Sequence, residues 1–171
     1  MPLVLETPRL VLRELSLDDL DFVAEMLAHP EVMHFWPRPY TRDEAADWIR
    51  RQQGRYARDG IGHWLALDKA SRQPIGQAGL LRQELDGVVE TGIGYMLHRP
   101  FWNQGYATEA AAGCRDHAFC KLGKKRVIAT VRPENFPSRR VAERIGFNYE
   151  RMTTWACLPH LLYAETRRPQ P

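Results

Sequence analysis

Two junctions between a strand and a helix follow each other about thirty residues apart in the second half of this sequence, and no other feature constrains the fold as strongly. The first leads from the apolar stretch 93–97 into a predicted helix over residues 105–122. The second leads from the apolar stretch 126–131 into a predicted helix over residues 135–145. This strand–helix–strand–helix order favours two neighbouring parallel strands. Parallel neighbours that both lead into helices form one crevice at their carboxyl ends.

The first half of the chain has a different pattern. Apolar side chains recur at helical spacing over residues 18–27, after a cluster of acidic residues that suits the start of a helix. Thr41 and Glu44 form the pattern of a capping box, which predicts a second helix through Gln52. A proline-containing loop over residues 29–40 separates the two helices.

The other apolar stretches are short and are separated by polar turns, which is typical of strands. They cover residues 10–13, 64–67, 74–80, 147–155 and 161–166. The close spacing of those between 64 and 97 predicts an antiparallel meander. We therefore expect one α/β (α+β) domain over residues 1–171. Its central sheet is mixed and mostly antiparallel, with one splayed parallel strand pair and helices on both faces.

Composition excludes several classes of protein. The chain has 171 residues, of which 44% are hydrophobic and 26% charged, so it is neither disordered nor fibrous. The net charge is +3, divided into −2 over residues 1–85 and +5 over residues 86–171. This excess is too small to indicate a nucleic-acid partner, but it suits one small anionic ligand bound by the second half.

Several absences also shape the expectation. The start of the chain has no basic and apolar leader, and no stretch approaches the roughly 20 apolar residues of a membrane span. Three cysteines at 114, 120 and 157 form no pairing motif, as expected for reduced thiols in a cytoplasmic protein. No cluster of histidine, cysteine and acidic residues has the spacing of metal ligands, so no metal is expected.

The first junction has the features of a phosphate site. Backbone N–H groups are unpaired at a helix N-terminus, where the helix dipole is positive. Gly105 would let a phosphate approach the backbone, and Thr108 adds a hydroxyl donor. The same residues also fit an ordinary loop before a helix. Neither the dinucleotide-binding glycine pattern nor the nucleoside-triphosphate loop is present.

The second junction carries Asn135 and Ser138 at the start of its helix. Helix capping alone explains both residue types. It does not explain why two such junctions occur in succession.

In this order and spacing the sequence resembles the GNAT superfamily of acetyl-CoA-dependent N-acetyltransferases, and within it the RimJ/RimL-like ribosomal-protein N-acetyltransferases. The resemblance rests on residues 7–13, 29–33, 39–41, 94–97, 102–110, 135–138 and 143–147. The sequence departs from that subgroup at Asn103, where glycine is common, and at Gly92, where glutamate is common.

The resemblance implies an acetyl-CoA site. The pyrophosphate would meet the backbone of Gln104, Gly105, Tyr106, Ala107 and Thr108. The pantetheine arm would pair with Met96 and Leu97 as an added strand does. Asn135 would bind the pantetheine, Arg140 the 3′-phosphate, and Ser138 would protonate the leaving thiolate. Arg99 and Arg139 are further candidates for contact with phosphate.

The acceptor side is less defined. Glu90 is the first candidate for the general base, because it lies on the same strand face as Gly94, although a solvated strand acid would look the same. His98 is the alternative base. An aromatic group, His34, Phe35, Trp36 and Tyr40, would line the acceptor pocket, or else simply cover the core.

The resemblance therefore predicts transfer of the acetyl group to a primary amine by direct attack in a ternary complex. The acceptor would be a protein N-terminus or a small amine. The alternative is a CoA-binding regulator or sensor that has lost catalysis. The expected partners include no nucleic acid and no membrane, and the subgroup suggests a homodimer.

Overall fold

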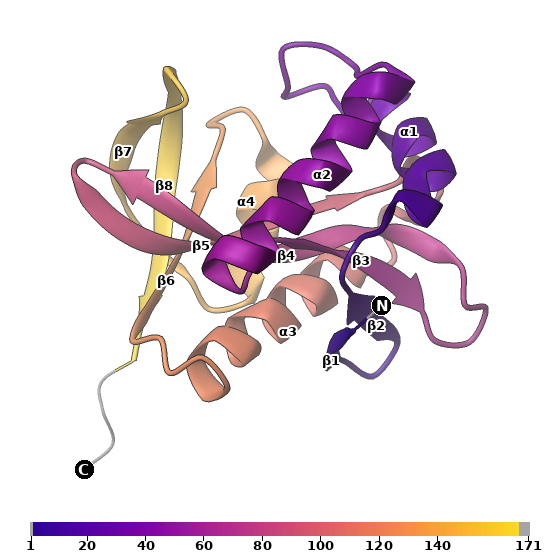
Figure 1. Cartoon of the computed structure of the whole chain (residues 1–171). Coiled ribbons are helices and arrows are strands. Elements are labelled where there is room, and N and C mark those ends of the chain that lie inside the picture. Colours follow the sequence, from indigo (N-terminus) through magenta and orange to yellow (C-terminus); the bar gives the residue numbers. More distant parts are fainter. Residues whose placement is uncertain (1, 168–171) are drawn as a thin grey trace.

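The computed structural model describes residues 2–167, and its helices and strands follow the predicted order (Figure 1). The strands are β1 (Leu3–Glu6), β2 (Leu10–Arg13), β3 (His63–Asp68), β4 (Pro74–Leu85), β5 (Val88–Leu97), β6 (Arg126–Val131), β7 (Asn148–Trp155) and β8 (Leu158–Thr166). The α-helices are α1 (Leu20–Ala28), α2 (Arg42–Asp59), α3 (Tyr106–Cys120) and α4 (Phe136–Arg144). Two short 3-10 helices, η1 (Leu17–Asp19) and η2 (Arg99–Phe101), precede α1 and α3.

All eight strands belong to one sheet, in the order β1-β2-β3-β4-β5-β6-β8-β7. Every neighbouring pair is antiparallel except β5 and β6, which are parallel. That parallel ladder has a single register pair, Gly92 with Ile128. The structure thus confirms the predicted meander, the parallel pair in the second half and the mixed sheet.

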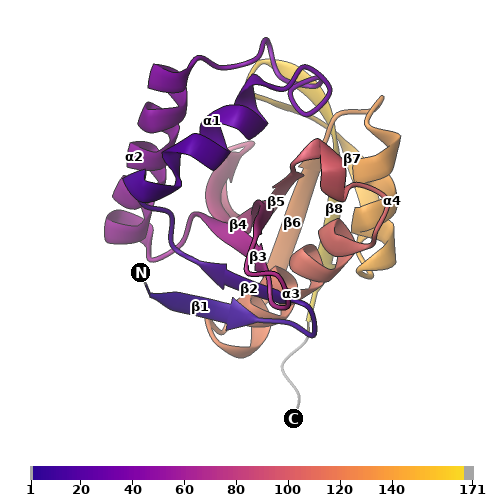
Figure 2. The ribbon, with the colours of Figure 1, turned by 90° about the vertical axis from the view of Figure 1, so that its right-hand side faces the viewer.

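Helices cover both faces of the sheet, as Figure 2 shows, with α1 and α2 on one side and α3 and α4 on the other. Successive side chains of a strand point to opposite faces. In β3, Trp64 therefore packs in the core shared with α3 and α4, while Leu65 packs in the core shared with α1 and α2. The sheet is consequently buried on both sides along its central strands.

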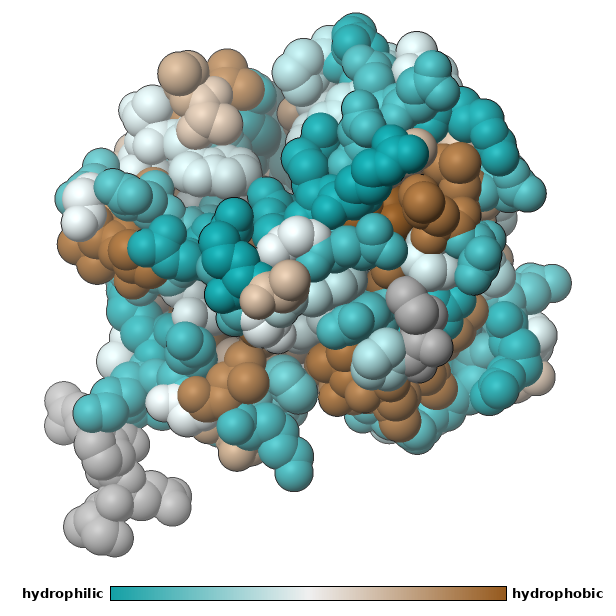
Figure 3. All heavy atoms as spheres, in the orientation of Figure 1, coloured by the Kyte–Doolittle hydropathy of each residue, from teal (hydrophilic) through white to brown (hydrophobic). Residues whose placement is uncertain are grey.

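The starts of the two long helices differ. Thr41 accepts a hydrogen bond from the Glu44 backbone, and the Glu44 side chain accepts one from the Thr41 backbone, so α2 begins with the predicted capping box. No side chain caps α3, whose N-cap is Gly105. The outer surface around α2 is mainly hydrophilic (Figure 3). Among residues 2–167, no helix has the length and apolar character to cross a membrane.

Two features of the sheet differ from the sequence prediction. Strand β1 was not predicted, because four residues at a sheet edge give too short a periodic pattern. Strands β4 and β5 are longer than predicted and meet in a two-residue turn at Asp86-Gly87. Both turn residues have positive φ angles, 51° and 78°, as a tight hairpin with the right-handed twist of its strands requires.

Gly79 tests how closely β3 and β4 pack. A Cβ atom on Gly79 would overlap the backbone carbonyl of Gly62, which cannot move away as a side chain can. We expect Gly79→Ala to lower the free energy of unfolding by about 2 kcal/mol or more. The control is Gly54→Ala, because Gly54 lies inside α2 with open space around it, and this change should stabilise by about 0.5–1 kcal/mol. Urea denaturation measures both, and equal stability of the two variants would contradict the packing.

Candidate active site

The site predicted from the sequence lies where β5 and β6 separate. Beyond Gly92 no residue of β5 is paired in the ladder with β6. Gly94, Tyr95 and Met96 are partly exposed, whereas Ile93 before them is buried. The backbone of this stretch is therefore not used in pairing with β6, as pairing with an extended ligand requires.

The loop before α3 lies next to the carboxyl end of β5. Asn103 and Gly105 both have positive φ angles, 61° and 80°, and turn the chain sharply into the helix. The start of one uncapped helix, with the residue before it, therefore contains all the residues predicted to bind pyrophosphate: Gln104, Gly105, Tyr106, Ala107 and Thr108. Backbone N–H groups of a first helical turn have no partner within the helix.

Arg9 is a residue of this loop that sequence reasoning missed. Its guanidinium donates to the Gln104 carbonyl oxygen (3.0 Å), pairs with Glu109 (2.6 Å) and lies over the Tyr106 ring (4.3 Å). It also lies 3.3 Å from the position of a Cβ on Gly105. Nothing in the sequence near Arg9 indicates that its side chain meets a loop 95 residues later.

The start of α4 is tied to β5 by a pair of hydroxyl groups. The Asn135 side chain accepts from the backbone N–H of Ser138 (3.2 Å). The Ser138 hydroxyl donates to the Tyr95 oxygen (2.9 Å), and the Tyr95 hydroxyl donates to the Ser138 carbonyl (2.8 Å). Burial raises the pKa of Tyr95 to about 12, so the phenol stays protonated. Tyr95 was not among the predicted site residues, yet it holds Ser138 at the crevice.

The three arginines named from the sequence have different environments. Arg99 pairs with Glu31 (2.8 Å) and lies over the Trp102 ring. Arg139 donates to the Tyr163 hydroxyl (3.3 Å) and to a backbone carbonyl. Arg140 is exposed on α4 and is the best placed of the three to reach a phosphate in solvent.

The two candidate bases both have partners. Glu90, near the start of β5, accepts from Arg126 (3.0 Å), which also pairs with Glu150 (2.6 Å). His98, directly after β5, is buried, and its Nε2 atom lies 3.1 Å from Glu25 of α1. Neither side chain lies beside the accessible stretch of Gly94, Tyr95 and Met96 as a free group.

The aromatic loop between α1 and α2 lines a cavity of about 380 Å³. Its walls are His34, Phe35, Trp36, Pro37, Arg132, Glu134 and Leu158. Three of the four predicted acceptor residues are therefore exposed to this cavity. The fourth, Tyr40, packs behind them against Trp36 and Trp48.

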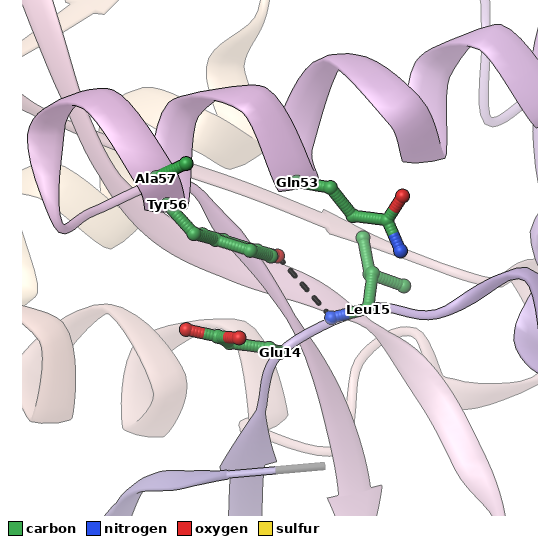
Figure 4. Close-up of a pocket in the computed structure, with 5 residues that line it drawn as sticks. All are labelled: Glu14, Leu15, Gln53, Tyr56 and Ala57. Carbon is green, nitrogen blue, oxygen red and sulfur yellow. Dashed lines mark hydrogen bonds between the residues drawn. The ribbon is translucent and has the colours of Figure 1, made fainter.

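His63 is a buried histidine that no sequence pattern distinguishes. It is 8% exposed, its backbone N–H donates to Gln52 (3.0 Å), and its carbonyl accepts from the Tyr56 hydroxyl. Tyr56 also accepts from the Leu15 backbone at the edge of a second cavity, of about 400 Å³ (Figure 4). Burial lowers the pKa of His63 to about 3, so its imidazole is neutral near pH 7.

A family model described as the acetyltransferase (GNAT) domain matches residues 9–148. This match includes both junctions and the loop before α3. The chain belongs to the GNAT acetyltransferase family. It is accordingly an acetyl-CoA-dependent N-acetyltransferase.

Curated relatives are similar over most of the chain. An uncharacterized protein of Bacillus subtilis, YkkB, is 33% identical over 122 residues, which are 71% of each chain. An uncharacterized N-acetyltransferase of Bacillus licheniformis, p20, is 32% identical over 150 residues, covering 85% of this chain and 83% of the relative.

Solved structures share the GNAT fold. An acetyltransferase from Agrobacterium tumefaciens is 27% identical, with a TM-score of 0.84 over 98% of this chain and 95% of its own. RimL, a ribosomal L7/L12 α-N-protein acetyltransferase solved with coenzyme A, is 16% identical, with a TM-score of 0.80 over 97% of this chain and 98% of its own. The likeness to RimL is one of fold.

The neutral state of His63 makes stability depend on pH. The unfolded chain binds a proton near pH 6.5, while the folded chain resists it until about pH 3. His63 therefore contributes stability at pH 7 that is lost as the pH falls through this window. We expect the melting temperature of the wild type to fall relative to that of His63→Phe between pH 7 and pH 4. Differential scanning fluorimetry across this range measures it, and a constant difference would contradict the assignment.

Proposed function

We propose that this GNAT enzyme acetylates a primary amine while acetyl-CoA and the amine are both bound in the crevice between β5 and β6. The observation that carries the proposal is the end of the parallel ladder at Gly92. It leaves the backbone of Gly94, Tyr95 and Met96 accessible, next to the uncapped start of α3.

The residues on both sides of the crevice fit the two ends of acetyl-CoA, which supplies the acetyl group as an activated thioester. Backbone groups of Met96 and Leu97 would pair with the pantetheine arm, although the Leu97 carbonyl already accepts from Trp102 (2.8 Å). A backbone N–H there would stabilise negative charge on the carbonyl oxygen, an effect of about 3 kcal/mol. The loop from Gln104 to Thr108 would bind the pyrophosphate, and Arg9, paired with Glu109, would hold this loop through the Gln104 carbonyl.

The start of α4 would serve the pantetheine and the leaving group. The side-chain oxygen of Asn135 accepts the capping hydrogen bond. The side-chain NH2 group therefore remains to donate to the pantetheine. Ser138, placed by Tyr95, would protonate the departing thiolate. Exposed Arg140 would pair with the 3′-phosphate.

The acceptor would enter between the aromatic loop and the hairpin of β7 and β8, where His34, Phe35 and Trp36 line the cavity. Glu90 stays our candidate for the final proton acceptor, reached through water along β5, since Arg126 holds its carboxylate in place. His98 is less suitable, because it is buried against Glu25. A protein N-terminus and a small amine are both candidate acceptors, and the homodimer and cytoplasmic location stay predictions.

The pyrophosphate assignment is tested by Gly105→Glu. A glutamate there fills the space beside the backbone and puts a negative charge against phosphate. We expect the dissociation constant of acetyl-CoA to rise about 100-fold, equivalent to about 2.7 kcal/mol. Isothermal titration calorimetry measures it.

The matched control is Gly123→Glu. Gly123 also has a positive φ angle, 61°, with open space around it, but it lies at the opposite end of α3. It carries the same added charge and the same backbone cost, so acetyl-CoA should bind it as it binds the wild type. Equal affinity of the two variants would remove the pyrophosphate assignment. Binding without thiol release for any amine would favour the sensor alternative.

Ser138→Ala separates catalysis from binding. If Ser138 protonates the thiolate, kcat should fall about 100-fold, which is typical for loss of a general acid. The affinity for acetyl-CoA should change less than threefold, because about one hydrogen bond is lost. A thiol-release assay combined with calorimetry measures both. Equal losses in turnover and affinity would make Ser138 a binding residue only.

A further inference from the structure

Three glycines lie on the face of β4 and β5 that α2 covers, and polar side chains from neighbouring strands occupy the space above two of them. His63, Gly79 and Gly94 form one row across β3, β4 and β5. Because Gly79 has no side chain, the His63 imidazole extends across β4 to Gly94. A Cβ on Gly94 would lie 2.5 Å from His63 Nε2.

The second occupied position is Gly92, where β5 meets β6. The carboxamide of Gln83, from β4, lies where a side chain on Gly92 would begin. Its Nε2 atom donates to the Thr130 hydroxyl of β6 (3.2 Å), so the side chain spans β5 at the foot of the crevice. Gln83 is only 6% exposed, and its Oε1 atom accepts no hydrogen bond from residues 2–167.

His63 is fixed in this position. Its backbone is held by Gln52 and Tyr56, and its ring packs on Trp48 (5.3 Å between ring centroids). Nδ1 is buried without a partner among the described residues. Nε2 faces Gly94, and no hydrogen bond from residues 2–167 reaches it. The ring nitrogen of a neutral histidine that carries no proton is a hydrogen-bond acceptor, so Nε2 is available to a bound molecule.

We propose that His63 Nε2 and Gln83 Oε1 accept the two N–H groups of the primary amine that attacks the acetyl group. Gly92 and Gly94 are two residues apart on one strand face, a separation of about 6.6 Å at about 3.3 Å per residue. Gln83 Oε1 overlaps the Cβ position of Gly92, and His63 Nε2 lies 2.5 Å from that of Gly94, so the two acceptors flank one short stretch of β5. This inference rests on the proposed function and names the residues that hold its acceptor.

Two acceptors leave the nitrogen lone pair as the one group free to attack. The new N–C bond forms as the C–S bond breaks; the nitrogen loses one proton, and the departing thiolate gains one. A secondary amine has a single N–H group and can satisfy only one of the two acceptors. The pair therefore selects primary over secondary amines. Only the uncharged amine has a lone pair with which to attack.

Steady-state kinetics test the proposal with acetyl-CoA and three probe amines, a glycyl peptide, spermidine and kanamycin. His63→Phe keeps a ring on Trp48 but removes the nitrogen, and Gln83→Leu removes the carbonyl oxygen. Each should raise the KM of the best amine about tenfold, as the loss of one hydrogen bond predicts, with the KM of acetyl-CoA within twofold of the wild type. N-methylation of that amine should raise its KM in the wild type, and should raise its KM less in the two variants.

The control is His117→Phe, because His117 lies on α3 and packs against Trp64 on the opposite face of the sheet. It should leave both KM values unchanged. An amine KM within twofold of the wild type in both site variants would overturn the proposal. So would equal increases in the KM values of amine and acetyl-CoA.

A second measurement needs no variant. In the wild type with CoA and the amine, the ¹⁵N spectrum of the histidine rings should place the His63 proton on Nδ1, with Nε2 accepting. A proton on Nε2, or no change when the amine is added, would overturn the inference. Failure of the proposed function looks different, since the wild type would then release no thiol with any amine.

Discussion

The single register pair between β5 and β6 is the constraint on which the rest of the site depends. A continuous parallel ladder would use the backbone groups of both strands, and no edge would remain for a ligand. Because the ladder ends at Gly92, the two strands diverge and each leads into its own helix. Hydrogen bonds between Tyr95 and Ser138 then join β5 to α4 across the gap. These hydrogen bonds therefore fix the position of β5 relative to the start of α4.

Glycine in the central strands serves a related purpose. Strand interiors usually lose stability at glycine, because no side chain packs there. At Gly92 and Gly94 the space that a side chain would fill is occupied by polar side chains of neighbouring strands, Gln83 and His63. Among the described residues the buried Nδ1 atom of His63 has no partner, which departs from the rule that buried polar groups are satisfied. Such departures gather at functional sites.

Local sequence signals predicted most of the fold. The capping box at Thr41, the glycines that end helices and the two strand-to-helix junctions all depend on residues close together in the chain. Strand β1 was missed, because it is short and gains order from pairing with β2. Both β4 and β5 were predicted too short, since most residues that flank the Asp86-Gly87 turn are polar or exposed.

By itself, the sequence determined the family, the mixed sheet and the loop at Gly105, because these follow from motifs within one or two elements. Only the tertiary structure brought Arg9 to that loop, paired Glu90 with Arg126 and laid His63 over Gly94. Those contacts depend on strand register. The contact of His63 with Gly94 also depends on Gly79, which lies between them and has no side chain. Shifting a register by one residue turns every side chain to the other face, so no local pattern could assign them.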